Sequence, residues 1–104
     1  MKNIVALSIT LISFSSIAST SSDAKNVLLK ELAKCHVAYE RSRNLEKADE
    51  IKIALKKHTT NNNFNRIINA EFNYQRTSEI DPNAVIRKHC LDSKSKIAAL
   101  NISK

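Results

Sequence analysis

The chain contains no glycine, no tryptophan and only one proline among its 104 residues. Glycine adopts a positive φ angle more readily than any other residue, so turns that need such an angle must rely on asparagine in this sequence. Sheets joined by tight hairpins are therefore not expected. The remaining composition is rich in Leu, Ala, Lys, Glu, Arg and Ile, which favour helix. The sequence predicts an all-α fold.

The missing glycines also exclude two common enzyme signatures. Phosphate-binding loops depend on glycine, and the serine-nucleophile elbow needs the pattern G-x-S-x-G. The adjacent carboxylates Asp49 and Glu50 are typical of a solvated helix surface. We therefore expect a protein that is not an enzyme and that has no cofactor.

Long apolar runs are absent as well. The longest predominantly apolar stretch, residues 4–14, has eleven residues, whereas a helix that spans a bilayer needs roughly 20. It follows one lysine and precedes small and hydroxyl residues, which is the layout of a secretory signal peptide. The small residues favour cleavage near residue 18 or near residue 24. We expect residues 1–24 to be a signal peptide and the cleaved protein to be periplasmic or secreted, with no transmembrane span.

Cysteine is scarce, with two residues in the chain. Exported proteins favour disulfides, and two cysteines allow a single intramolecular pairing, Cys35 with Cys90. Two free thiols or an intermolecular bridge are the alternatives. A small domain over residues 25–104 buries little surface, and on the chain-entropy model this bridge would stabilise it by about 4 kcal/mol.

Apolar residues at helical spacing divide the domain into segments. A first stripe contains Leu32, Cys35 and Tyr39 and stops at residues 42–44, after which a new stripe begins. Either two helices, at 26–42 and 45–58, or one long bent helix fits this pattern. With two helices, Asn44 or Ser42 would cap the second. Tyr39 is expected beside the bridge, with its hydroxyl reaching the edge of the core.

The second half of the domain predicts two more helices. The polar residues 58–65 indicate a loop, and the apolar residues that follow, up to residue 74, indicate a helix. Asp81 and Pro82 match an N-cap and a first helical position, so a last helix begins there and carries Cys90 on its apolar side. The predicted fold is a small bundle of three to four short antiparallel helices, cross-linked by one disulfide between the first and last helices.

Each cysteine has a histidine beside it, as Cys35-His36 and His89-Cys90. Metal ligands on one helix usually stand three or four residues apart, whereas neighbouring residues diverge by about 100 degrees. If the two helices are antiparallel, the histidines turn to opposite sides. We therefore expect no metal site and place both histidines at the boundary or surface. The wide spacing of the cysteines also differs from redox C-x-x-C pairs.

The formal net charge of +7 predicts attraction to anionic surfaces. The basic residues are scattered among acidic ones, which favours a solvated mixed-charge surface over a dedicated patch. The candidate contacts for an anionic partner are Lys52, Lys56, Lys57, Arg66 and Arg76.

Three aromatic residues fall close together, Phe64, Phe72 and Tyr74. The two phenylalanines are expected in the core because the domain has few other large apolar residues, and Tyr74 fits either the core or an exposed face.

Together these patterns predict a small exported, disulfide-stabilised helical protein that acts as a non-enzymatic interaction or accessory factor of a bacterial periplasm or secreted fraction. Its partner would be another protein that binds one helical face. The alternative is a cationic binder of anionic envelope polymers, lipid or nucleic acid. A small metal-binding or redox protein is the third and weakest hypothesis.

Overall fold

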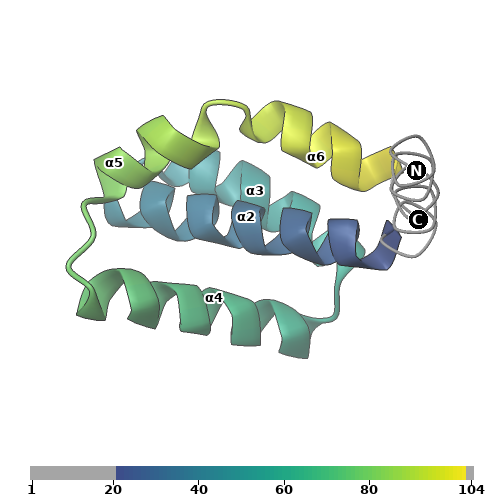
Figure 1. Ribbon diagram of the computed structural model, residues 1–104, viewed down its shortest axis with the longest axis horizontal. Coiled ribbons are helices and arrows are strands. Elements are labelled where there is room, and N and C mark those ends of the chain that lie inside the picture. Colours follow the sequence, from purple (N-terminus) through teal and green to yellow (C-terminus); the bar gives the residue numbers. More distant parts are fainter. Residues whose placement is uncertain (1–20, 103–104) are drawn as a thin grey trace, which may run out of the picture.

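The computed structural model describes residues 21–102, which form five α-helices and one π-helical turn (Figure 1). The elements in chain order are α2 (Ser21–Arg41), α3 (Leu45–His58), α4 (Asn61–Thr77), α5 (Pro82–Val85), the π-helical turn η1 (Ile86–Cys90) and α6 (Ser93–Ile102). The predicted all-α fold is confirmed for these residues. Of the predicted signal peptide, residues 1–20 lie outside the described part, so it stays a prediction.

Helix α2 lies at the centre of the domain and contacts every other helix (Figure 1). It is antiparallel to α3, which covers one side, and α4 and the α5–η1–α6 segment flank it on two others. Five consecutive residues of α2, 35–39, are buried. A surface helix would bury only one stripe. The single apolar stripe predicted through Leu32, Cys35 and Tyr39 is therefore too narrow. The buried surface is wider because α3, α4 and the α5–η1–α6 segment all pack on α2.

Of the two arrangements that the sequence left open, the structure has two separate helices and not one long bent helix. Helix α2 ends at Arg41, and the side chain of Asn44 caps α3 by accepting a hydrogen bond from the Lys47 amide. Between them Arg43 adopts a φ of 70°. The Asn44 amide donates to the Tyr39 carbonyl at 2.8 Å, which closes a Schellman motif at the end of α2.

The end of α4 repeats this geometry. Glu79 has a φ of 52°, and the Ile80 amide donates to the Gln75 carbonyl at 2.9 Å. The expectation that positive φ angles would be confined to asparagine is thus wrong. Arg43 and Glu79 both adopt the left-handed conformation, although it costs a residue with a Cβ roughly 1–2 kcal/mol. The helix-ending hydrogen bonds offset that cost.

The loop predicted over residues 58–65 is much shorter in the structure. Helix α4 already begins at Asn61, because the Thr60 hydroxyl accepts a hydrogen bond from the Asn63 amide at 3.1 Å. Asparagine-rich sequence is typical of loops, but here a threonine N-cap starts a helix through it. Only Thr59 and Thr60 separate α3 from α4.

The last helical segment begins as predicted, with Asp81 as the N-cap and Pro82 at the first position. It does not continue as one α-helix. The π-helical turn η1 intervenes, followed by a turn at residues 91–92. In an α-helix Val85 and Cys90 would lie about 140 degrees apart, whereas the wider π-helical turn, with its i→i+5 hydrogen bonds, brings residues five apart nearer to the same side. Both side chains are consequently buried against α2.

Candidate functional site

Cys35 and Cys90 form the predicted disulfide. Their Cα atoms lie 5.6 Å apart, and the bridge fastens η1 to the C-terminal half of α2. Both cysteines are essentially inaccessible to solvent. Tyr39 packs beside the bridge as predicted, and its hydroxyl donates to the Cys90 carbonyl at 3.4 Å. The bridge is a structural link inside the core.

The predicted boundary or surface position of His36 is wrong. Its side chain is buried, with Nδ1 2.8 Å from the Ala48 carbonyl oxygen. A carbonyl only accepts, so Nδ1 is the donor, and this bond satisfies the buried ring across the α2–α3 contact. The Phe64 ring meets the imidazole edge-on at 6.1 Å. His36 therefore belongs to the core.

His89 lies on the boundary, as expected, and its Nδ1 is 3.7 Å from the Glu31 carboxylate. The two histidines thus contact different elements, α3 for His36 and the exposed side of α2 for His89. Within residues 21–102 no three side chains of His, Cys, Asp or Glu come together as metal ligands would.

Glu31 is the centre of a small charge cluster. Its carboxylate lies 3.0 Å from Lys34 Nζ and 3.7 Å from Lys96 Nζ, in addition to His89. Partial burial by itself would raise the pKa of this carboxyl. The hydrogen bond from Lys34 and the charges of Lys34, Lys96 and His89 outweigh burial and hold the pKa below its usual value. The cluster ties α6 to α2.

Because folding lowers the pKa of Glu31, its ionised form stabilises the protein above the pKa of the unfolded chain, about 4.3, and this stabilisation is lost as pH falls through the lower folded pKa. We expect Glu31→Gln to destabilise the protein at neutral pH and to have a progressively smaller effect below pH about 4. Urea unfolding of both proteins across this range measures the difference. Glu50→Gln, at an exposed position on α3, is the control, and a Glu31→Gln effect that is constant with pH contradicts the prediction.

The five basic residues predicted to contact an anionic partner lie on two helices. Lys52 is paired with Asp49 at 3.7 Å, and Lys57 is exposed. Arg66 and Arg76 are ten residues apart on α4, which is about 15 Å along the helix axis. Their role as contacts stays a prediction.

Two of these cations cover aromatic rings. Lys56 Nζ lies 5.1 Å from the centre of the Phe64 ring, and the Arg76 guanidinium lies 5.6 Å from that of Phe72. Phe64 is buried, which confirms its predicted place in the core, whereas Phe72 is half-buried and Tyr74 is exposed.

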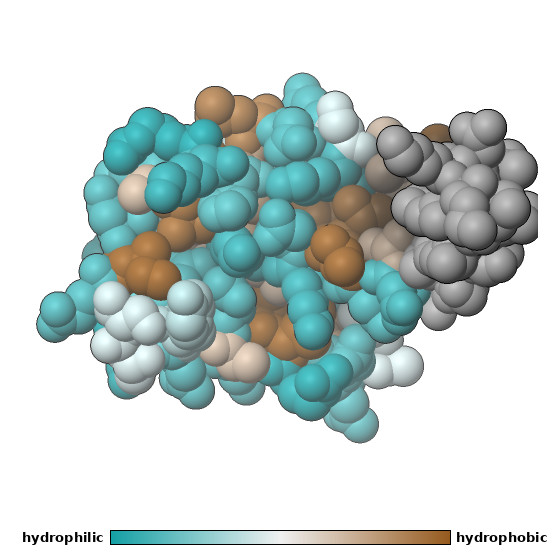
Figure 2. Space-filling model, in the orientation of Figure 1, coloured by the Kyte–Doolittle hydropathy of each residue, from teal (hydrophilic) through white to brown (hydrophobic). Residues whose placement is uncertain are grey.

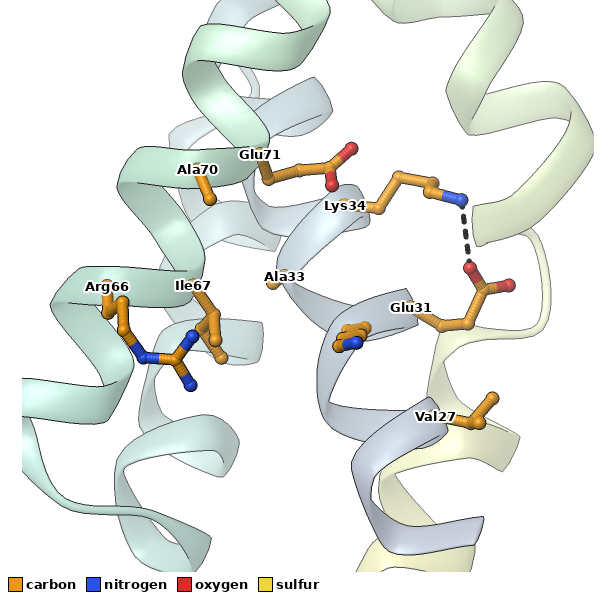
Figure 3. A pocket seen from close by; sticks show the side chains of 9 residues that line it. Val27, Glu31, Ala33, Lys34, Arg66, Ile67, Ala70 and Glu71 are labelled. Atoms are coloured by element: carbon orange, nitrogen blue, oxygen red, sulfur yellow. Dashed lines mark ion pairs between the residues drawn. The ribbon is translucent and has the colours of Figure 1, made fainter. Parts of the chain in front are cut away.

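An open groove runs along the seam between α2 and α4. Its largest part has a volume of about 510 Å³ and is lined by both helices (Figure 3). A second part of about 300 Å³ shares Lys34 and Glu71 with it and extends to α5 and η1. A third part of about 250 Å³ shares Lys30, Arg66 and Ile67 at the other end. The three depressions therefore adjoin one another along the seam, and we call them together the α2–α4 groove.

Apolar and charged side chains both line the α2–α4 groove. Its apolar members are Val27, Leu29, Ala33, Ile67, Ala70, Ile80, Ala84 and Val85. Figure 2 shows apolar surface between α4 and the α5–η1–α6 segment, over α2. The cations are Lys30, Lys34, Arg66 and Lys88, against the two carboxylates Glu31 and Glu71. Tyr74 stands exposed at the groove wall. Of the five predicted anion contacts, Arg66 is the one that lines the groove.

Sequence reasoning missed the buried Gln75 at the floor of this groove. Its amide nitrogen donates to the Lys34 carbonyl at 3.1 Å, and its amide oxygen accepts from Arg41 at 3.2 Å. Arg41 also donates to the Ile80 carbonyl at 2.8 Å. A signal was present, because Gln75 continues the helical spacing of Phe64 and Ile68 at a core position.

Comparison with protein-family models, curated protein sequences and solved structures finds no match to this chain. Among residues 21–102, no helix has the length and apolar character needed to cross a membrane.

Proposed function

We propose that this is an exported, non-enzymatic interaction protein whose helical domain binds a protein partner in the α2–α4 groove. The observation that carries the proposal is the groove itself. Other sides of α2 are covered by α3 and by α5–η1–α6, while its seam with α4 stays open along its length.

The shape of the groove favours a segment of polypeptide over a small molecule. Sites for small ligands bury most of the ligand in an enclosed cavity, whereas this groove is long and open. On α4 it extends over thirteen residues, from Asn63 to Gln75, which is about 18 Å along the helix axis. That length accommodates about three turns of a helix laid lengthwise, which is a recurrent mode of protein recognition.

The side chains of the groove support the same proposal. Exposed Val27 and Tyr74, together with Ala70, offer apolar contacts in the manner of an interface centre. Lys30, Arg66 and Lys88 surround them with positive charge. Export is supported by the disulfide, which is typical of oxidising compartments, and by the signal-like residues 1–24.

Site-specific photo-crosslinking in the native host tests this function. With the photoreactive residue at position 70 in the groove, we expect a crosslink to one protein, and with it at position 99, an exposed alanine of α6, we expect none. The crosslinked protein is then purified and its affinity measured for two matched variants.

Ala70→Arg should weaken binding by at least about tenfold, because the long side chain occupies the groove, and Ala99→Arg should leave it unchanged. Both alanines are exposed on helices, so neither variant disturbs the core. Equal crosslinking at both positions, or equal affinity of both variants, overturns the assignment of the groove.

A further inference from the structure

The α2–α4 groove carries positive charge that the domain itself does not neutralise. Of its two carboxylates, Glu31 is paired with the lysines of its charge cluster, and Glu71 accepts a hydrogen bond from the buried Gln75 amide at 3.2 Å. Three other cations line the groove, Lys30, Arg66 and Lys88. All three are exposed, and within residues 21–102 none of them takes part in an ion pair.

Two of these cations line the same end of the groove from different helices. Lys30 belongs to α2 and Arg66 to α4, and both line the same two of the three depressions. None of the described residues that line the end depression, of about 250 Å³, is acidic. Figure 3 shows the Arg66 guanidinium directed from α4 toward α2, and the Asn63 side-chain oxygen accepts a hydrogen bond from it. An anion at this end therefore meets a cation from each wall.

We infer that the partner segment in the groove is an acidic amphipathic helix, with a carboxylate seated between Lys30 and Arg66. The inference rests on the proposed function and adds to it the chemistry of the partner. An arginine binds a carboxylate through two parallel N–H donors, and the lysine adds a compact positive charge beside it. Further carboxylates along the same edge of the helix would reach Lys88 at the other end of the groove.

The middle of the groove favours such a helix over nucleic acid. Ala33, Ile67 and Ala70 line the central depression of about 510 Å³, together with the two carboxylates. A nucleic-acid backbone carries its negative charge along its whole length and would place phosphates beside these carboxylates. An amphipathic helix separates its apolar and charged faces, and small alanines on both walls allow its backbone to come close.

The cations are expected to control the affinity and its dependence on salt. Replacing both, in Lys30→Gln with Arg66→Gln, should weaken the binding of an acidic helix by about tenfold at low ionic strength. The difference should shrink as salt is added, because screening weakens the attraction between exposed charges in the unaltered protein. The apolar contacts of the groove remain in the double variant.

Selection from a displayed library of amphipathic helices tests the inference. The library keeps one apolar face over about three turns and fills the other positions with equal shares of acidic, basic and neutral residues. The protein is recovered after export with its disulfide intact. We expect the selected helices to be enriched in Asp and Glu, and we expect Lys30→Gln with Arg66→Gln to select helices without this enrichment.

A matched control separates the groove from the general positive charge of the protein. Arg87→Gln with Lys94→Gln also removes one arginine and one lysine, and both residues are exposed. Neither is among the residues that line the groove, and neither forms an ion pair within residues 21–102. This variant should select the same acidic helices and bind them within about twofold of the unaltered protein.

The outcomes distinguish a failure of this inference from a failure of the proposed function. Selected helices that lose binding in Ala70→Arg but have no acidic enrichment, or that keep it in Lys30→Gln with Arg66→Gln, would leave the groove as a docking site and overturn the inference. Helices that bind Ala70→Arg unchanged would overturn both.

Two further results count against the acidic helix alone. If the library yields no binder, the inference is wrong, while photo-crosslinking at position 70 still decides the proposed function. A single-stranded oligonucleotide that binds through Lys30 and Arg66 more tightly than any selected helix would make this end of the groove a nucleic-acid site.

Discussion

Opening the Cys35–Cys90 bridge is expected to lower the free energy of unfolding by about 4 kcal/mol, the largest effect of any single change considered for this protein. The two cysteines are 55 residues apart, so the bridge removes the closure entropy of a long loop from the unfolded chain. A domain of this size has a total stability of about 5–15 kcal/mol, and the small ones lie near the bottom of that range. Much of the stability of the oxidised protein therefore depends on one bond.

Urea unfolding measures this loss in three forms of the protein: oxidised, reduced, and the double variant Cys35→Ala with Cys90→Ala. The reduced form keeps both sulfur atoms, so it isolates the effect of the covalent link from that of the packing. The double variant should be less stable again, because it also removes buried atoms. A difference between the oxidised and reduced forms smaller than about 1 kcal/mol contradicts the prediction.

The loss should be uneven across the fold. Beyond the bridge, α5, η1 and α6 are held to α2 chiefly by Val85, Ile97 and Leu100 and by the Glu31 charge cluster. These short segments bury few residues of their own. In the reduced protein we expect amide hydrogens of α6 to exchange faster than those of α3, and hydrogen exchange resolves the two helices.

The features predicted from sequence are those that depend on local signals. The interrupted stripe favoured a boundary at residues 42–44 but left one long bent helix open, and the N-cap at Asp81 followed from its place before Pro82. The disulfide followed from two cysteines on the apolar sides of helices that a bundle brings together. For the boundary and the cap, residues within a few positions determine the structure, as capping and helical spacing do. The disulfide joins distant residues, but two cysteines allow only one intramolecular pairing.

The features that sequence reasoning missed depend on which helices surround α2. His36 was placed at the boundary or surface because it diverges by about 100 degrees from Cys35, which faces the core, but α3 covers that side of α2 as well and provides the Ala48 carbonyl. The α2–α4 groove exists because the α5–η1–α6 segment packs on α2 without closing over α4. The apolar pattern of a single helix does not show how far apart its neighbouring helices lie.

The candidate site was only partly predictable for the same reason. Arg66 was named from its charge, and it lines the groove. Lys30 and Lys34 have the same charge but were not named, because nothing in their sequence positions shows that α4 leaves them beside an open seam.

Replacing Gln75 with alanine is expected to destabilise the protein by about 3 kcal/mol. Gln75 is 1% exposed, and its amide joins α4 to the Lys34 carbonyl and to Arg41 of α2. Truncation leaves these groups without their partner in a place that water reaches poorly, and it also leaves a cavity. Unsatisfied buried polar groups cost about 1–3 kcal/mol and lost side-chain volume adds to this.

The comparison of Gln75→Ala with Asn69→Ala separates this buried network from a general effect of polar substitutions on α4. Asn69 is exposed on the same helix, so its removal should change stability by less than about 0.5 kcal/mol. Gln75→Glu keeps the size and the acceptor for Arg41 but replaces the amide nitrogen, which donates to the Lys34 carbonyl and to Glu71, with a carboxylate oxygen. It should cost at least as much as Gln75→Ala, because a buried carboxylate would then face a carbonyl oxygen and a second carboxylate. Equal urea midpoints for Gln75→Ala and Asn69→Ala would show that α4 is held by its apolar contacts alone.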